Sequence, residues 1–131
     1  MYRGMVKDSD GRPVSGQNAM AKGVATGNAL AIRNQDIPIS DIGTVRPNTG
    51  GMSGSINPLD LPDHRKPPKW NGTNSKVDIF MIEDVKFNPG LKVTSPINNG
   101  HIMVEPAYEM ILSEYKNKIW KTRPYWKVQE P

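Results

Sequence analysis

The sequence predicts a single α+β domain, spanning residues 1–131, in which short strands outnumber helices. A chain of this length is usual for one domain and buries enough surface for a core without disulfides. Its twelve glycines and twelve prolines, against two phenylalanines, indicate many turns between short elements. Apolar and polar residues alternate in several short segments, as in strands, and one segment near the C-terminus has helical spacing. We therefore expect a sheet accompanied by one or two short helices.

The N-terminal half is expected to hold one strand and much irregular chain. Residues 1–6 (MYRGMV) are small and apolar and end at a turn-rich segment, which predicts the first strand. Residues 15–35 mix alanine, glycine and asparagine. A weak helix around Ala19–Gly23 is one interpretation, but Gly16, Gly23 and Gly27 favour a loop or partial order. Residues 57–75 carry four prolines, and a long loop of this kind in a compact domain is usually functional or disordered.

Three further strands are expected, at KVDIFMIEDV (76–85), LKVTS (91–95) and HIMVEP (101–106). In the last of these, period-two alternation sends Ile102 and Val104 to one face. A half-buried strand turns its apolar pair to the core. His101 and Glu105 are therefore expected to share the opposite face and to line whatever lies beside the sheet.

A helix of two to three turns is predicted at SEYKNKIWK (113–121), with Ser113 as its N-cap. Leu112, Tyr115 and Ile119 recur at three- and four-residue spacing, which predicts a stripe that faces the core. Through this helix and the tail after it, basic residues interleave with Trp120, Tyr125 and Trp126; the basic residues are Lys116, Lys118, Lys121, Arg123 and Lys127. A helix with its aromatics packed inward and its lysines in water explains this pattern, and RNA binding by charge and stacking is the alternative.

Composition and charge exclude several classes of function. The chain has no cysteine, which removes disulfides, thiolate nucleophiles and cysteine-based zinc sites, and its two histidines are too few for a histidine-only metal site. No apolar run approaches the roughly 20 residues of a membrane span, and the first twenty residues lack the apolar stretch of a signal peptide. The net charge of +4 is compatible with an anionic ligand or partner. We expect neither a bound metal ion nor association with a membrane.

Several familiar catalytic motifs are missing from the sequence. No lysine follows Gly50-Gly51, so there is no P-loop, and there is no GxGxxG. The glycines of GMSG stand one residue too close for a GxSxG nucleophile elbow. The candidates that remain are Arg3 on the first strand, Ser53 after the double glycine, and His101 and Glu105 on the late strand.

These four candidates have the chemistry that NAD requires. An arginine can hold a diphosphate bidentately, and a small hydroxyl beside glycines can hydrogen-bond a ligand that lies against the backbone. A carboxylate can bind a ribose hydroxyl and stabilise an oxocarbenium-like centre. NAD is a diphosphate with a scissile N-glycosidic bond, so it combines the three requirements. The alternatives are a plain turn at Gly50-Gly51, a structural role for His101 and a surface position for Glu105.

Several segments resemble mono-ADP-ribosyltransferases. YRG on the first strand, a GGxS-type strand and a glutamate on a late strand resemble the Arg–Ser–Glu plan of these enzymes. More narrowly, five blocks together are similar to small ADP-ribosyltransferase-like toxin domains that bacteria deliver by type VI secretion, alone or at the end of Rhs proteins: MYRG, RPNTGGMSGSI, LPDHRKPP, GLKV and HIMVEPAYEMILSEY. The resemblance spans nearly the whole chain, although residues 7–40 contribute little. It implies a split, perpendicular β-sheet core.

The resemblance implies roles for the residues that match its motifs. Arg3 would hold the phosphates or the ribose of NAD. Gly50, Gly51 and Ser53 would form the strand against which the nicotinamide ribose lies. Glu105 would hydrogen-bond the ribose 2′-hydroxyl and stabilise the developing cation.

Other residues near these motifs are candidates for binding. Tyr2 and Trp70 are the aromatic candidates for stacking on the nicotinamide. His101 is a candidate for ribose binding. His64, Arg65 and Lys66 form a charged cluster in the proline-rich loop; a solvated cluster is the usual reason for such a pattern, and contact of His64 and Arg65 with the substrate is the alternative.

Two departures from the family pattern bear on the substrate. The Ser-Thr-Ser triplet of the superfamily is here Met52-Ser53-Gly54-Ser55, so Ser53 and Ser55 are both candidates for the functional serine. The residue two before Glu105 is Met103, where the superfamily has glutamate or glutamine. The absence of that glutamate or glutamine argues against protein arginine as the acceptor. Together with the basic surface, it favours a structured RNA over a protein.

The resemblance also implies partners and a place of action. An antibacterial toxin of this kind would leave its producer through a contact-dependent secretion apparatus and act in the cytoplasm of the recipient bacterium. Its producer would need a cognate immunity protein, which we expect to cover the cleft with acidic residues. A chain that opens on its first core strand also suggests a domain excised from a larger protein.

Three alternative functions stay open at this point. An NAD glycohydrolase on the same fold would pass the ribosyl cation to water. A metal-independent ribonuclease toxin would use His64 or His101 as acid and base, with Arg65 on the phosphate, and would need no NAD. A non-catalytic binding module would depend on Trp120 and Arg123 in the tail rather than on a carboxylate.

Overall fold

The computed structural model describes residues 1–95 and 100–131, and there the chain is an α+β structure built on antiparallel strands. Six strands pair in the order β5-β6-β3-β1-β4-β8, and two more form a separate ribbon, β2-β7. The strands are β1 Tyr2–Met5, β2 Thr44–Val45, β3 Met52–Ser55, β4 Asp78–Met81, β5 Leu91–Thr94, β6 His101–Pro106, β7 Met110–Ile111 and β8 Lys127–Val128. The predicted α+β class is confirmed, and four of these strands lie within the segments expected at residues 1–6, 76–85, 91–95 and 101–106.

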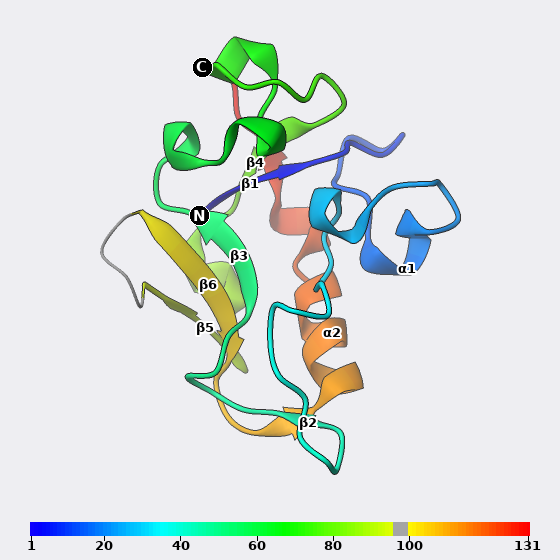
Figure 1. Cartoon of the computed structure of the whole chain (residues 1–131), viewed down its shortest axis with the longest axis vertical. Coiled ribbons are helices and arrows are strands. Elements are labelled where there is room, and N and C mark those ends of the chain that lie inside the picture. Colours follow the sequence, from blue (N-terminus) through cyan, green and yellow to red (C-terminus); the bar gives the residue numbers. More distant parts are fainter. Residues whose placement is uncertain (96–99) are drawn as a thin grey trace.

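The six-stranded sheet consists of two halves that meet at one point (Figure 1). β1 pairs with β4 over four residues and β3 pairs with β6 over four, whereas the described register between β1 and β3 is the pair Tyr2↔Ser55. β1 runs across the direction of β3 in Figure 1. The two strands therefore diverge from this pair, and Arg3 and Ser53 lie inside the fork. Inside the fork, the backbone N–H and C=O groups of β1 and β3 need hydrogen-bond partners other than a neighbouring strand.

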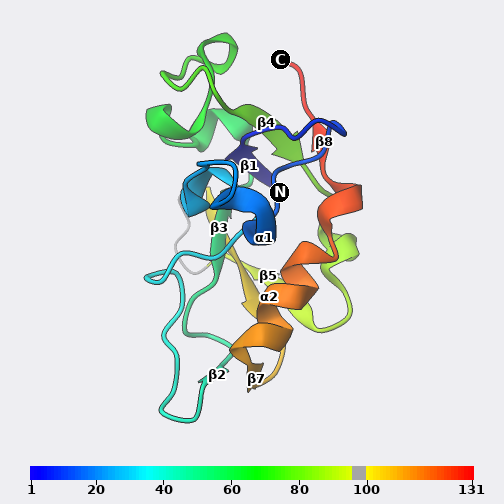
Figure 2. The ribbon, with the colours of Figure 1, turned by 90° about the vertical axis from the view of Figure 1, so that its right-hand side faces the viewer.

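The core lies between the sheet and the helix α2 (Leu112–Trp120), which is seen beside the strands in Figure 2. Tyr115 and Ile119 of the helix are fully buried, as is Val104 of β6, while Ile102 beside it is 4 % exposed. The predicted stripe on the helix and the predicted alternation of β6 are both confirmed. Burial of these apolar side chains is the main force that holds helix to sheet.

The start of α2 differs from the prediction at Ser113. Ile111 occupies the N-cap position without a side-chain cap, and the helix begins at Leu112, so Ser113 lies inside it. The predicted N-cap is therefore wrong. β7 ends at Ile111, and the extended backbone of this strand passes directly into the helix. The pairing of β2 with β7 therefore determines the residue at which α2 begins, and the capping preference of Ser113 does not.

The chain between β1 and β2 contains little regular structure. α1 spans Gly16–Ala19 and ends where the weak helix around Ala19–Gly23 would begin, so the helix is not found there and the loop that the glycines favour is. Residues 20–22 form a turn that is closed by a hydrogen bond from the Val24 N–H to the Ala19 carbonyl, 2.8 Å. Gly23, with φ of +68°, turns the chain out of it.

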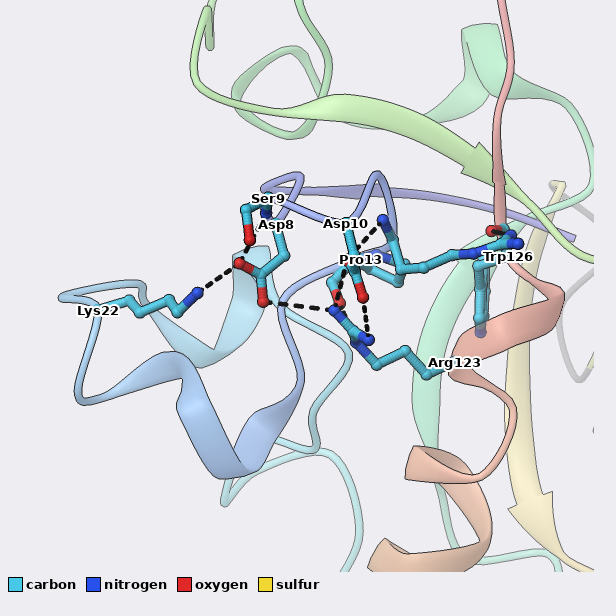
Figure 3. Close-up of polar contacts among 8 residues, drawn as sticks. Asp8, Ser9, Asp10, Pro13, Lys22, Arg123 and Trp126 are labelled. Carbon is cyan, nitrogen blue, oxygen red and sulfur yellow. Dashed lines mark hydrogen bonds and ion pairs between the residues drawn. The ribbon is translucent and has the colours of Figure 1, made fainter.

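A clasp of ion pairs joins the segment after β1 to the segment after α2 (Figure 3). Arg123 donates to both carboxylate oxygens of Asp10, at 2.7 and 2.9 Å, and to Asp8 and the Pro13 carbonyl. Lys22 binds the same Asp8. These bonds place Arg123 in a structural role. With Trp126 fully buried next to it, they favour packing of Arg123 and Trp126 in the fold over contact of these two residues with RNA.

Candidate functional site

Five of the predicted site residues line a single cavity of about 290 Å³: Arg3, Ser53, His64, Arg65 and His101. They come from four separate segments of the chain. β1 supplies Arg3, β3 supplies Ser53 and β6 supplies His101. A one-turn 3₁₀ helix at Asp63–Arg65, in the proline-rich loop, supplies the other two. This cavity is called the cationic cavity below, because its charged lining residues, which also include Arg33, are all basic in the described part of the chain.

Arg3 fills the fork between β1 and β3 and is 5 % exposed. Its guanidinium donates to the Ser53 carbonyl at 2.6 Å, to the Ala29 carbonyl through two nitrogens at 3.1 and 3.4 Å, and to the Ala31 carbonyl at 3.4 Å. Four of the five N–H groups of an arginine are thereby used by backbone. Burial lowers the pKa of Arg3 to about 10, and the nearby Asp36 carboxylate partly opposes this shift.

Arg33 and Arg65 stand close enough to Arg3 to lower its pKa further. Burial, and then the charge of Arg33, lower the pKa of Arg65 as well. Among the described residues, the carboxylate that moderates these charges is Asp36, which accepts from the Arg33 side chain at 3.2 Å and from its backbone N–H at 2.8 Å. Three guanidinium groups thus share one nearby carboxylate. The net positive charge that remains favours the binding of an anion.

Two glycines permit the approach of Arg65 to the cavity wall. A Cβ on Gly27 would lie 2.3 Å from Nη1 of Arg65, and a Cβ on Gly4 would lie 1.7 Å from its carbonyl oxygen. Nη1 also donates to Oδ1 of Asn28 at 2.6 Å. The Arg65 guanidinium is therefore held against the 27–28 segment, and its position is set by the fold.

Glu105 lies in a second cavity, of about 360 Å³, lined by Asn48, Thr49, Gly50, Thr94, Ser95, Met103 and Glu105. It is 2 % exposed, and each of its oxygens accepts a hydrogen bond. The Asn48 N–H donates to Oε1 at 2.5 Å, and the Thr94 hydroxyl donates to Oε2. The carboxylate is thus fixed in orientation, and each oxygen keeps a lone pair for a ligand.

The two cavities adjoin along the β3–β6 pair. Ser53 lines the cationic cavity, and its partner across the strands, Met103, lines the cavity of Glu105. His101 and Glu105 therefore share a face of β6, as predicted, but they open into different cavities. A ligand that touches both must lie across the Ser53–Met103 pair.

The double glycine is a place of close backbone packing. A Cβ on Gly51 would lie 2.1 Å from the Val104 carbonyl oxygen, and a Cβ on Gly50 would lie 2.3 Å from that of Asp36. The Gly51 N–H donates to the same Asp36 carbonyl at 2.8 Å. Gly50 also lines the cavity of Glu105. These glycines let the 36–37 segment and β6 close around the start of β3.

The remaining candidates lie at differing distances from the two cavities. Ser55 is 2 % exposed and its hydroxyl donates to the Gly100 carbonyl at 3.2 Å, whereas Ser53 lines the cationic cavity. Tyr2 is half-buried, and Trp70 donates its indole N–H to the Gln129 carbonyl. Within the described residues, neither aromatic lines either cavity.

Comparison with protein-family models, curated proteins and solved structures found no match to this chain. Within residues 1–95 and 100–131, no group of three or more histidine, aspartate or glutamate side chains is placed to hold a metal ion. In the same part of the chain, no helix has the length and apolar character needed to cross a membrane.

Sequence reasoning missed several residues that build the site. Arg33 and Asp36 lie in a segment that carries no strand, helix or motif. Asn48, in a loop, and Thr94, on β5, contribute by donating hydrogen bonds to the Glu105 carboxylate. The Arg33–Asp36 pair at three-residue spacing is a local signal. Nothing in the spacing of the other residues points to Glu105.

Proposed function

We propose that this domain is an antibacterial toxin that cleaves NAD and transfers its ADP-ribose to a target inside the recipient cell. The observation that carries the proposal is the adjacency of a cationic cavity and a buried, oriented carboxylate along one strand pair. A dinucleotide needs both: positive charge for its diphosphate and, one sugar away, a carboxylate for its ribose.

In the proposed reaction, the diphosphate of NAD lies in the cationic cavity and the nicotinamide ribose lies over Ser53 and Met103. Glu105 accepts a hydrogen bond from the ribose 2′-hydroxyl through the lone pairs left by Asn48 and Thr94. The N-glycosidic bond breaks, and its electron pair leaves with nicotinamide. The Glu105 carboxylate stabilises the resulting ribosyl cation. A nucleophile of the acceptor then bonds to C1′ and gives up its proton to water.

The arrangement of the sheet supports the same proposal. An ADP-ribosyltransferase core consists of two sheets set across one another, with NAD at their junction. Here the β1-β4 and β3-β6 halves join at the pair Tyr2↔Ser55, and the cationic cavity lies beside that junction. Arg3 and Ser53 stand on the strands that diverge there.

The acceptor proposed is a structured RNA. Met103 stands where a second acidic or amide side chain would engage an arginine acceptor, and it brings no polar group to the cavity of Glu105. A third cavity, between α2 and the 86–91 segment, is lined by Lys86, Lys118 and Lys121, which adds positive surface for a polyanion. Export by a contact-dependent apparatus, action in the recipient cytoplasm and a cognate immunity protein complete the proposal.

The test follows labelled ADP-ribose into its acceptor. NAD labelled in the adenylate phosphate is incubated with the domain and a bacterial lysate, and the label is measured in the RNA and protein fractions. We expect label in RNA, and a fall of about 100- to 1,000-fold in Glu105→Gln, which keeps the shape of the side chain but removes its charge. Glu114→Gln, an exposed carboxylate on α2, is the matched control and retains activity.

The outcomes separate the members of this proposal. Label in protein would keep the transferase and replace the RNA acceptor. NAD consumed without label in either fraction would identify a glycohydrolase. Intact NAD, or full turnover by Glu105→Gln, would refute NAD cleavage at this site.

A second candidate function is a metal-independent ribonuclease. The observation that favours it is that His64, His101 and Arg65 line the same cavity, which brings two imidazoles and a guanidinium together. One imidazole would take the proton of a ribose 2′-hydroxyl, the other would protonate the leaving 5′-oxygen, and Arg65 would stabilise the charged phosphate. Cleavage of RNA without NAD, abolished by His64→Gln or His101→Gln and kept by Glu105→Gln, would establish this function in place of the transferase.

A further inference from the structure

The cationic cavity carries more positive charge than the fold neutralises. Arg3, Arg33 and Arg65 lie within electrostatic reach of one another, and Asp36, 4 % exposed at its side chain, is the carboxylate that offsets them in the described part of the chain. Like charges gathered in a cavity repel each other and cost stability. A cavity of this kind suits a ligand that brings about two negative charges.

Arg3 is poorly equipped to bind that ligand. Hydrogen bonds to the carbonyls of Ser53, Ala29 and Ala31 occupy four of its five N–H groups. A bidentate hold on a phosphate needs two parallel N–H groups on one edge of the guanidinium. Arg3 is left with at most one, so its main task is to tie the 29–31 segment to the fork of the sheet.

Arg33 and Arg65 have the donors that Arg3 lacks. Among the described residues, the Arg65 side chain makes one hydrogen bond, from Nη1 to Asn28, and that bond fixes its direction. The Arg33 side chain makes one, from Nε to Asp36, and it is 32 % exposed. Both side chains line the cavity, together with His64. Each keeps terminal N–H groups for an anion.

We propose that Arg33 and Arg65 form a clamp for a diphosphate, and that Arg3 braces the wall of this clamp instead of serving as its ligand. The identity of the ligand as a dinucleotide rests on the proposed function, whereas the diphosphate clamp rests on the cavity itself. A volume of about 290 Å³ lies just below the roughly 300–1,000 Å³ that is usual for pockets of small-molecule ligands. It accommodates a diphosphate and part of one sugar, which leaves the nicotinamide end for the cavity of Glu105.

The clamp is tested by calorimetric titration of the full chain with inorganic pyrophosphate, at low and moderate salt. Wild-type protein is expected to bind it, more weakly as salt rises. Arg33→Gln and Arg65→Gln should each weaken binding by about tenfold or more, because each loses charge-assisted hydrogen bonds. Arg46→Gln removes the same charge at an exposed arginine outside the cavity and should stay within about twofold of wild type.

Arg3→Lys distinguishes a brace from a ligand, because lysine keeps the positive charge but lacks the guanidinium N–H groups that bond to the three carbonyls. We expect a lower melting temperature and, in the protein that is still folded, pyrophosphate affinity closer to wild type than that of Arg65→Gln. Loss of affinity equal to that of Arg65→Gln with an unchanged melting temperature would overturn the assignment. So would a wild-type protein that fails to bind pyrophosphate at millimolar concentration.

Two further ligands show whether the clamp binds the diphosphate of a nucleotide or the single phosphates of RNA. They also keep the test of the clamp apart from the test of NAD cleavage. ADP-ribose that competes with pyrophosphate, and binds more tightly, supports a nucleotide diphosphate. A short RNA without terminal phosphates that displaces pyrophosphate at lower concentration overturns the diphosphate assignment in favour of single phosphodiesters. Pyrophosphate binding that depends on Arg65, in a protein that leaves NAD intact, supports the clamp and refutes the proposed reaction.

Discussion

The hydroxyl of Tyr115 ties the helix to the strand pair that carries the site, which makes Tyr115→Phe a direct test of the architecture. It donates to the Val104 carbonyl at 2.6 Å and accepts from the Met52 N–H at 3.1 Å. Val104 precedes Glu105, and Met52 precedes Ser53. One buried hydroxyl therefore holds the backbone beside both predicted catalytic residues.

The cost of removing this hydroxyl follows from its burial. Tyr115 is fully buried, and burial raises its pKa, so the hydroxyl stays protonated and keeps its donor role at any pH used for activity. Phenylalanine would leave one N–H and one carbonyl in the core without their partner, at about 1–3 kcal/mol for each unsatisfied group. We expect a loss of about 2–6 kcal/mol in the free energy of unfolding, and a fall in melting temperature of at least roughly 10 °C.

The measurement is urea unfolding followed by tryptophan fluorescence, for which buried Trp126 is a suitable reporter. Tyr108→Phe is the matched control, because that side chain is 49 % exposed and water replaces its hydroxyl contacts. The control is expected to stay within about 0.5 kcal/mol of wild type. A Tyr115→Phe variant no less stable than this control would refute the bridging role of the hydroxyl.

Two further predictions concern close packing and the ion-pair clasp. Gly51→Ala, whose Cβ would lie 2.1 Å from the Val104 carbonyl oxygen, should lower the free energy of unfolding by about 1–3 kcal/mol in the same urea assay, and an unchanged midpoint would contradict the packing. The hydrogen bond from Arg123 lowers the pKa of Asp10 below its ordinary 3.8, so the unfolded chain binds more protons in that range. The stability that this carboxylate contributes is present above pH 3.8 and is lost as pH falls through its folded pKa. In Arg123→Gln the melting temperature should therefore fall less between pH 6 and pH 3 than in wild type, and parallel curves would disprove the role of the clasp.

The elements that sequence predicted correctly are those whose pattern is complete within a few residues. Alternation in HIMVEP was enough to place Ile102 and Val104 in the core, and the spacing of Tyr115 and Ile119 was enough to orient α2. Local pattern failed at Ser113, because the preceding strand β7 fixes where the helix begins. It also gave no sign of the two-residue strands β2, β7 and β8, which are too short to show a period.

The site was predicted in part, because its motif residues stand on strands whereas their supports lie elsewhere. Arg3, Ser53 and His101 come together through strand pairing, which the strand assignments imply. Arg33 and Asp36 reach the same place because their segment is bonded to Arg3 of β1 and to the Gly51 N–H just before β3. Bonds of this kind join residues far apart in the chain and leave no periodic trace in the sequence.

The segment 27–37 shows why the site depends on Arg3 even if Arg3 binds no ligand. This segment has no strand, and its place against the sheet comes from its own carbonyls: Ala29 and Ala31 accept from Arg3, and Asp36 accepts from the Gly51 N–H. It carries Arg33 and one wall of the cavity. A change at Arg3 therefore acts first on stability, and loss of activity alone would not identify its role. In the described part of the chain, the Arg65 side chain bonds to this segment once, at the Asn28 side chain, and to none of its backbone carbonyls, so its variants report on the ligand more directly.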